Sequence, residues 1–122
     1  MSEQQFSLDA EQIAFREVIR KFAEDKIAPY AADSDHNSAY SWESFKALQQ
    51  MELTALSYPV EYGGSGASLV TQSVVAEELA RVCASTSLMF LISKLGMLPV
   101  INFGSEALKA KYLPRICTGE SQ

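Results

Sequence analysis

The stretch from residue 58 to residue 66, YPVEYGGSG, places three glycines within four residues, directly ahead of a segment with strong helical periodicity. Glycine reaches backbone angles that other residues avoid, so the stretch predicts a tight loop leading into a helix that opens near Ser68. A turn between helices is the simpler interpretation. A phosphate cradle is the alternative, since free amides at a helix N-terminus attract anions, but the sequence lacks a P-loop lysine and a GxGxxG motif after a strand.

Composition limits the size and the class of the protein. With 122 residues, 48% of them apolar, the chain is sized for one domain with a small core. A net charge of -5 argues against nucleic acid or an anionic membrane surface as partner. Cys83 and Cys117 have no metal-ligand spacing and are expected to be reduced, buried thiols in a cytoplasmic protein. Residues 1–7 are expected to form a polar tail without a targeting signal.

Ahead of the glycine stretch, the pattern predicts two helices. Ser7 or Asp9 caps the first, with Gln12 three residues after Asp9 as in a capping box, and an apolar stripe follows at Phe15, Val18, Ile19, Phe22 and Ala23. Pro29 is expected to end or kink this helix near Ile27, and residues 33–40 are expected to form a loop. Ser41 caps a second helix with Trp42, Phe45 and Leu48 on one side. Residues 53–57 are too short a stretch to distinguish helix from strand.

Behind the glycine stretch, the pattern predicts three more helices, and hence an all-α bundle of about five. The third runs from residue 69 to residue 83, with Val75, Leu79, Val82 and Cys83 on its inner side and with Gln72 and Arg81 elsewhere. The fourth follows Ser85 and is apolar on every face. The last begins after Ser105 and runs toward Gly119, with Leu108, Tyr112 and Ile116 at helical spacing.

The fourth helix carries more apolar surface than this chain can cover. Its pattern predicts burial on all sides, but a bundle of this size offers few neighbours. A membrane span is not expected, because the apolar run is shorter than about 20 residues and polar or helix-breaking residues interrupt it. Part of the surface is therefore expected to pack on another domain.

Three motifs in order carry a family resemblance. They are AEELARV at residues 76–82, the apolar helix through Gly96, and FGSEALK at residues 103–109. From Leu8 onward the chain resembles the N-terminal helical domain of the acyl-CoA dehydrogenase family of flavoenzymes. The resemblance implies that residues 8–122 form this one domain, which in the family packs on a β-domain and a C-terminal helical domain.

The resemblance implies an activity that this chain does not carry alone. In the family, a glutamate removes the α-proton of an acyl-CoA thioester and the β-hydrogen leaves as hydride to FAD. The flavin-side signature of the β-domain, with Glu-Pro and Gly-Ser-Asp, does not occur here. We therefore assign no catalytic, cofactor-binding or metal residue to this chain and expect FAD only in a complete enzyme. An electron-transfer partner and a homo-oligomer are implied for that enzyme, and an acyl-CoA oxidase or related flavoenzyme is the alternative.

Ser87, Leu91 and Leu95 are the candidate substrate-binding residues. Their spacing of four residues places them on one helix face, and by resemblance they match positions that line the acyl pocket. From spacing alone, ordinary core packing is the favoured interpretation of the two leucines.

Other conspicuous residues have structural interpretations. Glu77 and Glu78 are expected to be solvated or paired with Arg81. His36 is expected to face solvent, and Tyr58 and Tyr62 are expected to pack. The second functional hypothesis is a stand-alone helical module that hides its apolar helix by dimerising or by binding a partner.

Overall fold

The computed structural model describes residues 7–121, so nearly all of the expected tail at residues 1–7 lies outside the described part. Six α-helices form within it: α1 (Ala10–Phe22), α2 (Ala28–Asn37), α3 (Trp42–Gln50), α4 (Leu69–Val82), α5 (Ala84–Phe103) and α6 (Glu106–Cys117). A π-helical turn, Ala23–Ile27, joins α1 to α2, and 3-10 turns cover Leu53–Ala55 and Val60–Tyr62. Residues 7–121 contain no strand, which confirms the all-α prediction.

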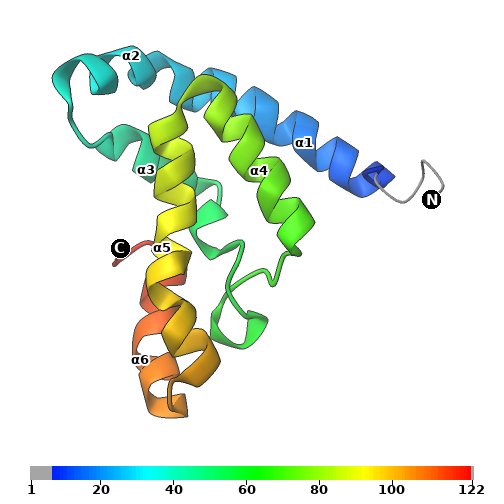
Figure 1. Ribbon diagram of the computed structural model, residues 1–122, viewed down its shortest axis with the longest axis vertical. Helices are drawn as coiled ribbons and strands as arrows, with labels where there is room; N and C mark the ends of the chain where they lie inside the picture. Colours follow the sequence, from blue (N-terminus) through cyan, green and yellow to red (C-terminus); the bar gives the residue numbers. More distant parts are fainter. Residues whose placement is uncertain (1–6, 122) are drawn as a thin grey trace.

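The helices are arranged around α4 and α5, which form a hairpin (Figure 1). Helix α1 packs across α4 at one end of the molecule, and α6 folds back beside the lower half of α5. Helix α3 and the π-helical turn pack together, and α3 also contacts α5. The arrangement leaves α5 as the longest helix, with neighbours on only part of its circumference.

Four of the five predicted helix starts are confirmed by their caps, while α5 begins at Ala84 rather than after Ser85 and has no side-chain cap. Asp9 and Gln12 form a capping box, with the Asp9 carboxylate accepting from the Gln12 backbone N–H at 2.7 Å. Three serine hydroxyls accept from backbone N–H groups three residues ahead, and they belong to Ser41, Ser68 and Ser105. Each cap satisfies an amide that the first helical turn leaves without a partner.

The predicted loop at residues 33–40 is wrong over most of its length, because α2 continues to Asn37. Pro29 lies in the first turn of α2, where a missing N–H costs nothing, so it opens this helix. The helical path is irregular just before Pro29, over the π-helical turn Ala23–Ile27. Ser38 ends α2 with a left-handed backbone, at φ 48°.

Two clusters form the core. The larger joins α1, α3, α4, α5 and the π-helical turn through residues such as Ile19, Ile27, Leu48, Val75 and Leu79. The smaller packs α6 on the loop region through Ala55, Tyr58, Leu113, Ile116 and Cys117. The predicted apolar stripes are partly wrong, since four of their members are exposed: Val18, Trp42, Leu108 and Tyr112.

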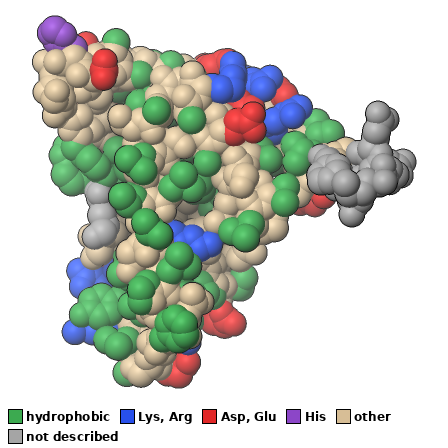
Figure 2. Space-filling model, in the orientation of Figure 1, with side chains coloured by type: hydrophobic (Ala, Val, Ile, Leu, Met, Phe, Trp, Pro, Cys, Tyr) green, Lys and Arg blue, Asp and Glu red, His purple; other side chains and the backbone are tan. Residues whose placement is uncertain are grey.

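Helix α5 is not buried on every side, contrary to the prediction. Only Thr86, Ser87 and Phe90 are buried, and the exposed members include Leu88, Leu91, Ile92, Leu95 and Phe103. Figure 2 shows hydrophobic side chains spread over the face that carries α5. The expected excess of apolar surface over available cover is therefore present in the structure.

The length of α5 also corrects the expectation about a membrane span. The helix has 20 residues and its most apolar window of 18 residues has a mean hydropathy of 1.5, so by length and composition alone it is long and apolar enough to cross a bilayer. Within the described residues, 17% of its most apolar window is buried. One such helix is weak support for a span, because the core helices of soluble proteins pass the same test.

A buried carboxylate ties α1 to α4. Glu78 is 2% exposed and accepts two hydrogen bonds from Arg20, from Nε at 3.0 Å and from Nη2 at 2.9 Å. Arg81 donates a third at 2.9 Å. Hydrogen bonding to Arg20, aided by Arg81, holds the pKa of Glu78 below its ordinary value, so this carboxylate stays ionised. The predicted pairing with Arg81 is confirmed, and Arg20 is an additional partner from a distant part of the sequence.

The glycine stretch forms the expected tight loop. Gly63 has φ 93°, a conformation that favours glycine. Gly64 lies so close to the Tyr58 backbone that a Cβ there would collide with the carbonyl group. The loop is thus closed by contact of backbone with backbone.

We predict that Gly64→Ala destabilises the 122-residue chain by about 3 kcal/mol, because the added methyl group has to displace the backbone of Tyr58. Gly96→Ala is the matched control. A Cβ at Gly96 meets no atom within 4 Å, and alanine in a helix interior is favoured by up to about 1 kcal/mol. Urea unfolding of both variants measures the difference, and equal midpoints would contradict the loop geometry.

We predict that Glu78→Gln lowers the free energy of unfolding by about 2 kcal/mol, because it leaves two guanidinium groups without their carboxylate. Glu77→Gln is the matched control, since Glu77 is the preceding residue of the same helix and is exposed. Its effect is expected to stay within about 0.5 kcal/mol. Chemical unfolding at neutral pH checks both values.

The contribution of Glu78 to the free energy of unfolding should depend on pH. Because the pKa of Glu78 is lowered on folding, its contribution is complete above the unfolded value of 4.5 and is lost as the pH falls through the folded value. The gap in unfolding free energy between the wild type and Glu78→Gln should therefore narrow below pH 4.5. A gap that is independent of pH in that range would show that Glu78 does not act through its charge.

Candidate functional site

A groove of about 360 Å³ lies between the start of α4 and the exposed face of α5. Leucine and isoleucine side chains form most of its wall, and its lining residues are Leu69, Gln72, Leu88, Leu91, Ile92, Lys94, Leu95 and Leu98. The volume falls in the range of small-molecule sites, which are mostly apolar with a few polar groups. This groove thus has both the volume and the largely apolar wall of a small-molecule site.

The structure brings two of the three candidate residues into this groove. Leu91 and Leu95 line it and are 46% and 64% exposed. Ser87 lies on the same helix but not in the lining: it is buried, and its hydroxyl donates to the Ala76 carbonyl at 2.8 Å. Helix α4 covers the beginning of the predicted face, so Ser87 fixes α5 against α4. The substrate-binding role of all three residues stays a prediction.

The groove also contains a polar pair that the sequence pattern did not single out. Lys94 Nζ donates to Gln72 Oε1 at 3.0 Å, and Gln72 Nε2 donates to the Ala67 carbonyl at 2.8 Å. Gln72 is buried on the inner side of α4, contrary to its expected placement away from that side. Lys94 follows Leu91 by three residues, and this helical spacing is the signal that placed it on the groove face.

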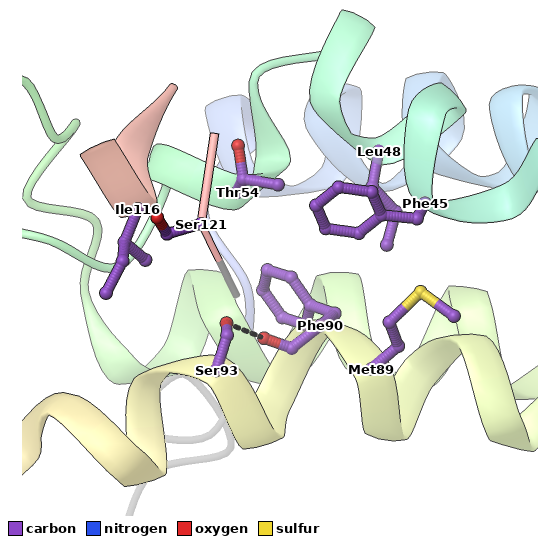
Figure 3. A pocket seen from close by; sticks show the side chains of 8 residues that line it. All are labelled: Phe45, Leu48, Thr54, Met89, Phe90, Ser93, Ile116 and Ser121. Carbon is purple, nitrogen blue, oxygen red and sulfur yellow. Dashed lines mark hydrogen bonds between the residues drawn. The ribbon is translucent and has the colours of Figure 1, made fainter. Parts of the chain in front are cut away.

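Two other hollows lie along α5. One of about 200 Å³ lies beside the groove near Cys83 and shares Leu88 and Ile92 with it; there Thr86 Oγ1 is buried without a hydrogen-bond partner among the described residues. The other separates α3 from α5, where the rings of Phe45 and Phe90 face each other (Figure 3). Its volume of about 10 Å³ holds at most one water molecule, so it is a gap in the core.

The glycine loop offers no free amide to a phosphate group. Five consecutive backbone N–H groups donate to backbone carbonyls, with the pairs Gly63 to Val60, Gly64 to Pro59, Ser65 to Ala55, Gly66 to Tyr58 and Ala67 to Leu56. An anion would have to break these bonds to enter. The interhelical turn is therefore the correct interpretation, and the phosphate cradle is wrong.

The remaining candidates have structural roles or lie in solvent. Tyr58 is fully buried, and this burial raises its pKa to about 12. Tyr62 packs against the smaller core cluster, and its hydroxyl donates to Glu106 at 2.6 Å. His36 is exposed, as expected, but lies on α2 rather than in a loop.

The described residues offer no cluster for metal chemistry. No group of three or more His, Cys, Asp or Glu side chains within residues 7–121 is placed to hold an ion. Cys83 and Cys117 are free thiols, the first half-buried and the second buried. Burial raises the pKa of Cys117, which keeps that thiol protonated.

Comparison with known proteins matches almost the whole chain. The family model described as "Acyl-CoA dehydrogenase, N-terminal domain" covers residues 9–120. The probable acyl-CoA dehydrogenase fadE25 of Mycobacterium leprae is 43% identical over 111 residues, which are 91% of this chain and 28% of that protein.

Solved structures agree with the family model. Butyryl-CoA dehydrogenase from Megasphaera elsdenii superposes with a TM-score of 0.80 at 30% identity, over 94% of this chain and 31% of that one. A nitroalkane oxidase active-site mutant crystallised with 1-nitrooctane gives a TM-score of 0.74 at 28% identity, over 95% of this chain and 28% of that one. The chain thus spans less than a third of the length of these relatives.

Proposed function

This chain belongs to the acyl-CoA dehydrogenase family, and we propose that it works as the N-terminal domain of an FAD-dependent enzyme that dehydrogenates acyl-CoA thioesters between Cα and Cβ. The family match over residues 9–120 supports this proposal, and the domain is taken as residues 8–122. The observation that carries it in the structure is the groove between α4 and α5, an apolar site open to whatever covers it. By itself the chain is proposed to be inactive.

The proposed contribution of this domain is a wall of the acyl pocket. Leu91 and Leu95 present branched apolar side chains to the groove. An alkyl chain that packs against them is removed from water, which lowers the free energy of binding. Ser87 holds α5 in place from below through its bond to Ala76. Because the face is exposed in this chain, a further part of the enzyme is proposed to close the groove and to complete the pocket.

The proposed cofactor binds outside this chain. FAD supplies the acceptor for the hydride in such an enzyme. Its diphosphate needs N–H donors, and those of the glycine loop are already used by backbone carbonyls. The domain therefore contributes shape to the substrate site, while the base and the flavin are proposed to come from the other domains.

The complete protein is proposed to be soluble and cytoplasmic, with protein rather than lipid covering α5. The groove supports this, because Lys94 and Gln72 interrupt the apolar face that a bilayer would require. An electron-transfer partner and homo-oligomerisation are proposed from the family alone.

Related chemistry is the alternative for the same domain. The structural likeness to a nitroalkane oxidase supports the wider class of flavoenzymes that share this helical fold, including oxidases. A stand-alone interaction module would use the same exposed face of α5 for a protein partner.

We predict that Leu91→Phe in the complete polypeptide that contains this chain shifts its preference toward shorter acyl chains. The larger ring fills the groove, so the kcat/KM for the longest accepted acyl-CoA should fall at least about tenfold relative to a short one. Steady-state kinetics across a series of straight-chain acyl-CoA thioesters measures this.

Leu108→Phe is the matched control for that experiment. Leu108 lies on α6 outside the groove and is 44% exposed, against 46% for Leu91. The control should leave the chain-length profile unchanged. An unchanged profile in both variants would remove Leu91 from the pocket, and a complete polypeptide without activity on any acyl-CoA would reject the proposed reaction.

We predict that the isolated 122-residue chain binds a hydrophobic dye and self-associates through α5. Leu95→Glu should lower dye fluorescence and the associated fraction, because Leu95 is 64% exposed on the apolar face. Leu108→Glu, on α6, is the control. A wild-type chain that is monomeric and silent toward the dye would count against the interpretation of α5 as a surface awaiting its own enzyme.

A further inference from the structure

The groove between α4 and α5 contains one charge, and its position is unusual for a lysine of this chain. Lys94 is half-buried, whereas Lys21, Lys26, Lys46 and Lys111 are exposed. Lys109 is also half-buried, but it pairs with Glu106 at 3.4 Å. Lys94 has no carboxylate within 4.0 Å among residues 7–121, so it is the half-buried lysine of the described chain whose charge has no opposite partner.

The amine of Lys94 is held in place. Gln72 accepts one hydrogen bond from it at 3.0 Å, and Gln72 is itself oriented by its bond to the Ala67 carbonyl. That second bond uses the amide nitrogen, so the amide oxygen is the atom presented to Lys94. An ammonium group has three donors, and the described residues satisfy one of them. Because Lys94 is half-buried, water or a ligand at the groove can satisfy the other two donors.

Lys94 is the one Lys or Arg in α5, and leucine and isoleucine side chains make up most of the groove lining around it. Surrounding an ammonium group with leucines removes water from it, and this costs free energy unless an anion or further acceptors compensate. Any further closure of the groove raises that cost. The arrangement is therefore complementary to an amphiphilic anion, with an alkyl portion for the leucines and a negative group for Lys94.

We propose that this groove recognises acyl thioesters whose far end carries a carboxylate, with Lys94, oriented by Gln72, as the group that binds it. This inference rests on the proposed function, because it assigns a substrate class to the same pocket. Lys94 lies six residues beyond Leu88, the first residue of α5 in the groove lining, which is about 9 Å along the helix axis at about 1.5 Å per residue. An acyl chain running past Leu91 along α5 thus brings its end to the amine. Charge-assisted hydrogen bonds to a carboxylate then replace the water that the chain displaces.

The test uses the complete polypeptide that contains this chain, with Lys94→Met as the neutral variant of similar length. For each protein, the kcat/KM for an ω-carboxyacyl-CoA is divided by that for the alkyl acyl-CoA of equal chain length. The wild type should favour the carboxylated thioester, and Lys94→Met should lower the ratio at least about tenfold, mainly through KM. Lys94→Arg should retain most of the preference, and Lys46→Met, an exposed lysine on α3, should retain all of it.

Binding measured without turnover provides a second readout. Isothermal titration of the same thioesters should show weaker binding of the carboxylated one to Lys94→Met, with little change for the alkyl one. The thermal midpoint of each variant identifies a folding defect, and Lys94→Gln replaces Lys94→Met if the latter fails to fold. Equal losses for both thioesters would assign Lys94 a structural role and overturn the proposal.

The remaining outcomes separate this inference from the proposed function. A wild type that turns over alkyl acyl-CoA but not ω-carboxyacyl-CoA overturns the substrate class alone. A wild type that turns over no acyl-CoA rejects the proposed function instead. A preference that survives Lys94→Met overturns the role of Lys94 in recognising the carboxylate.

Discussion

The structure depends on the constraint that α5 has more apolar surface than this chain can cover. A helix with leucine, isoleucine and phenylalanine on every side gains free energy wherever a neighbour removes it from water. Helices α3, α4 and α6 each cover one part of it. The side between the start of α4 and the middle of α5 stays open and becomes the groove. The candidate site is thus the part of α5 that the fold leaves uncovered.

Fixed contacts at both ends of α4 determine the shape of that opening. Near its end, Glu78 joins α4 to α1 through Arg20, and Ser87 of α5 bonds back to Ala76. Before its start, the glycine loop closes on its own backbone. Because these contacts tie both ends of α4 to neighbouring segments, they position Leu69 and Gln72 opposite α5. A site wall on rigid helices of this kind positions ligand groups better than a wall on loops.

The sequence predicts local features of this fold better than distant contacts. Helix caps and the glycine turn depend on neighbours within a few residues, so Asp9, Ser68 and Gly64 could be interpreted from sequence alone. Arg20 and Glu78 are 58 residues apart, and no periodicity reports that pairing. The extent of α2 was mispredicted because a proline that ends one helix also fits the first turn of the next. The burial of α5 was mispredicted because the hydrophobicity of a side chain shows only that it can be buried. Whether it is buried depends on which other helices pack against it.

In the candidate site, Leu91 and Leu95 could be predicted from local sequence, whereas the pairing of Lys94 with Gln72 depends on contacts between distant residues. The leucines follow from helical spacing, and the family resemblance adds their assignment. The hydrogen bond between Lys94 and Gln72 joins α5 to α4, so it can be predicted only when the packing faces of both helices are known. A lysine in sequence is a solvated charge by default, and only the packing of α4 against α5 removes Lys94 partly from water. Its missing counter-charge is therefore a property of the assembled groove, where two helices leave one cation facing an apolar channel.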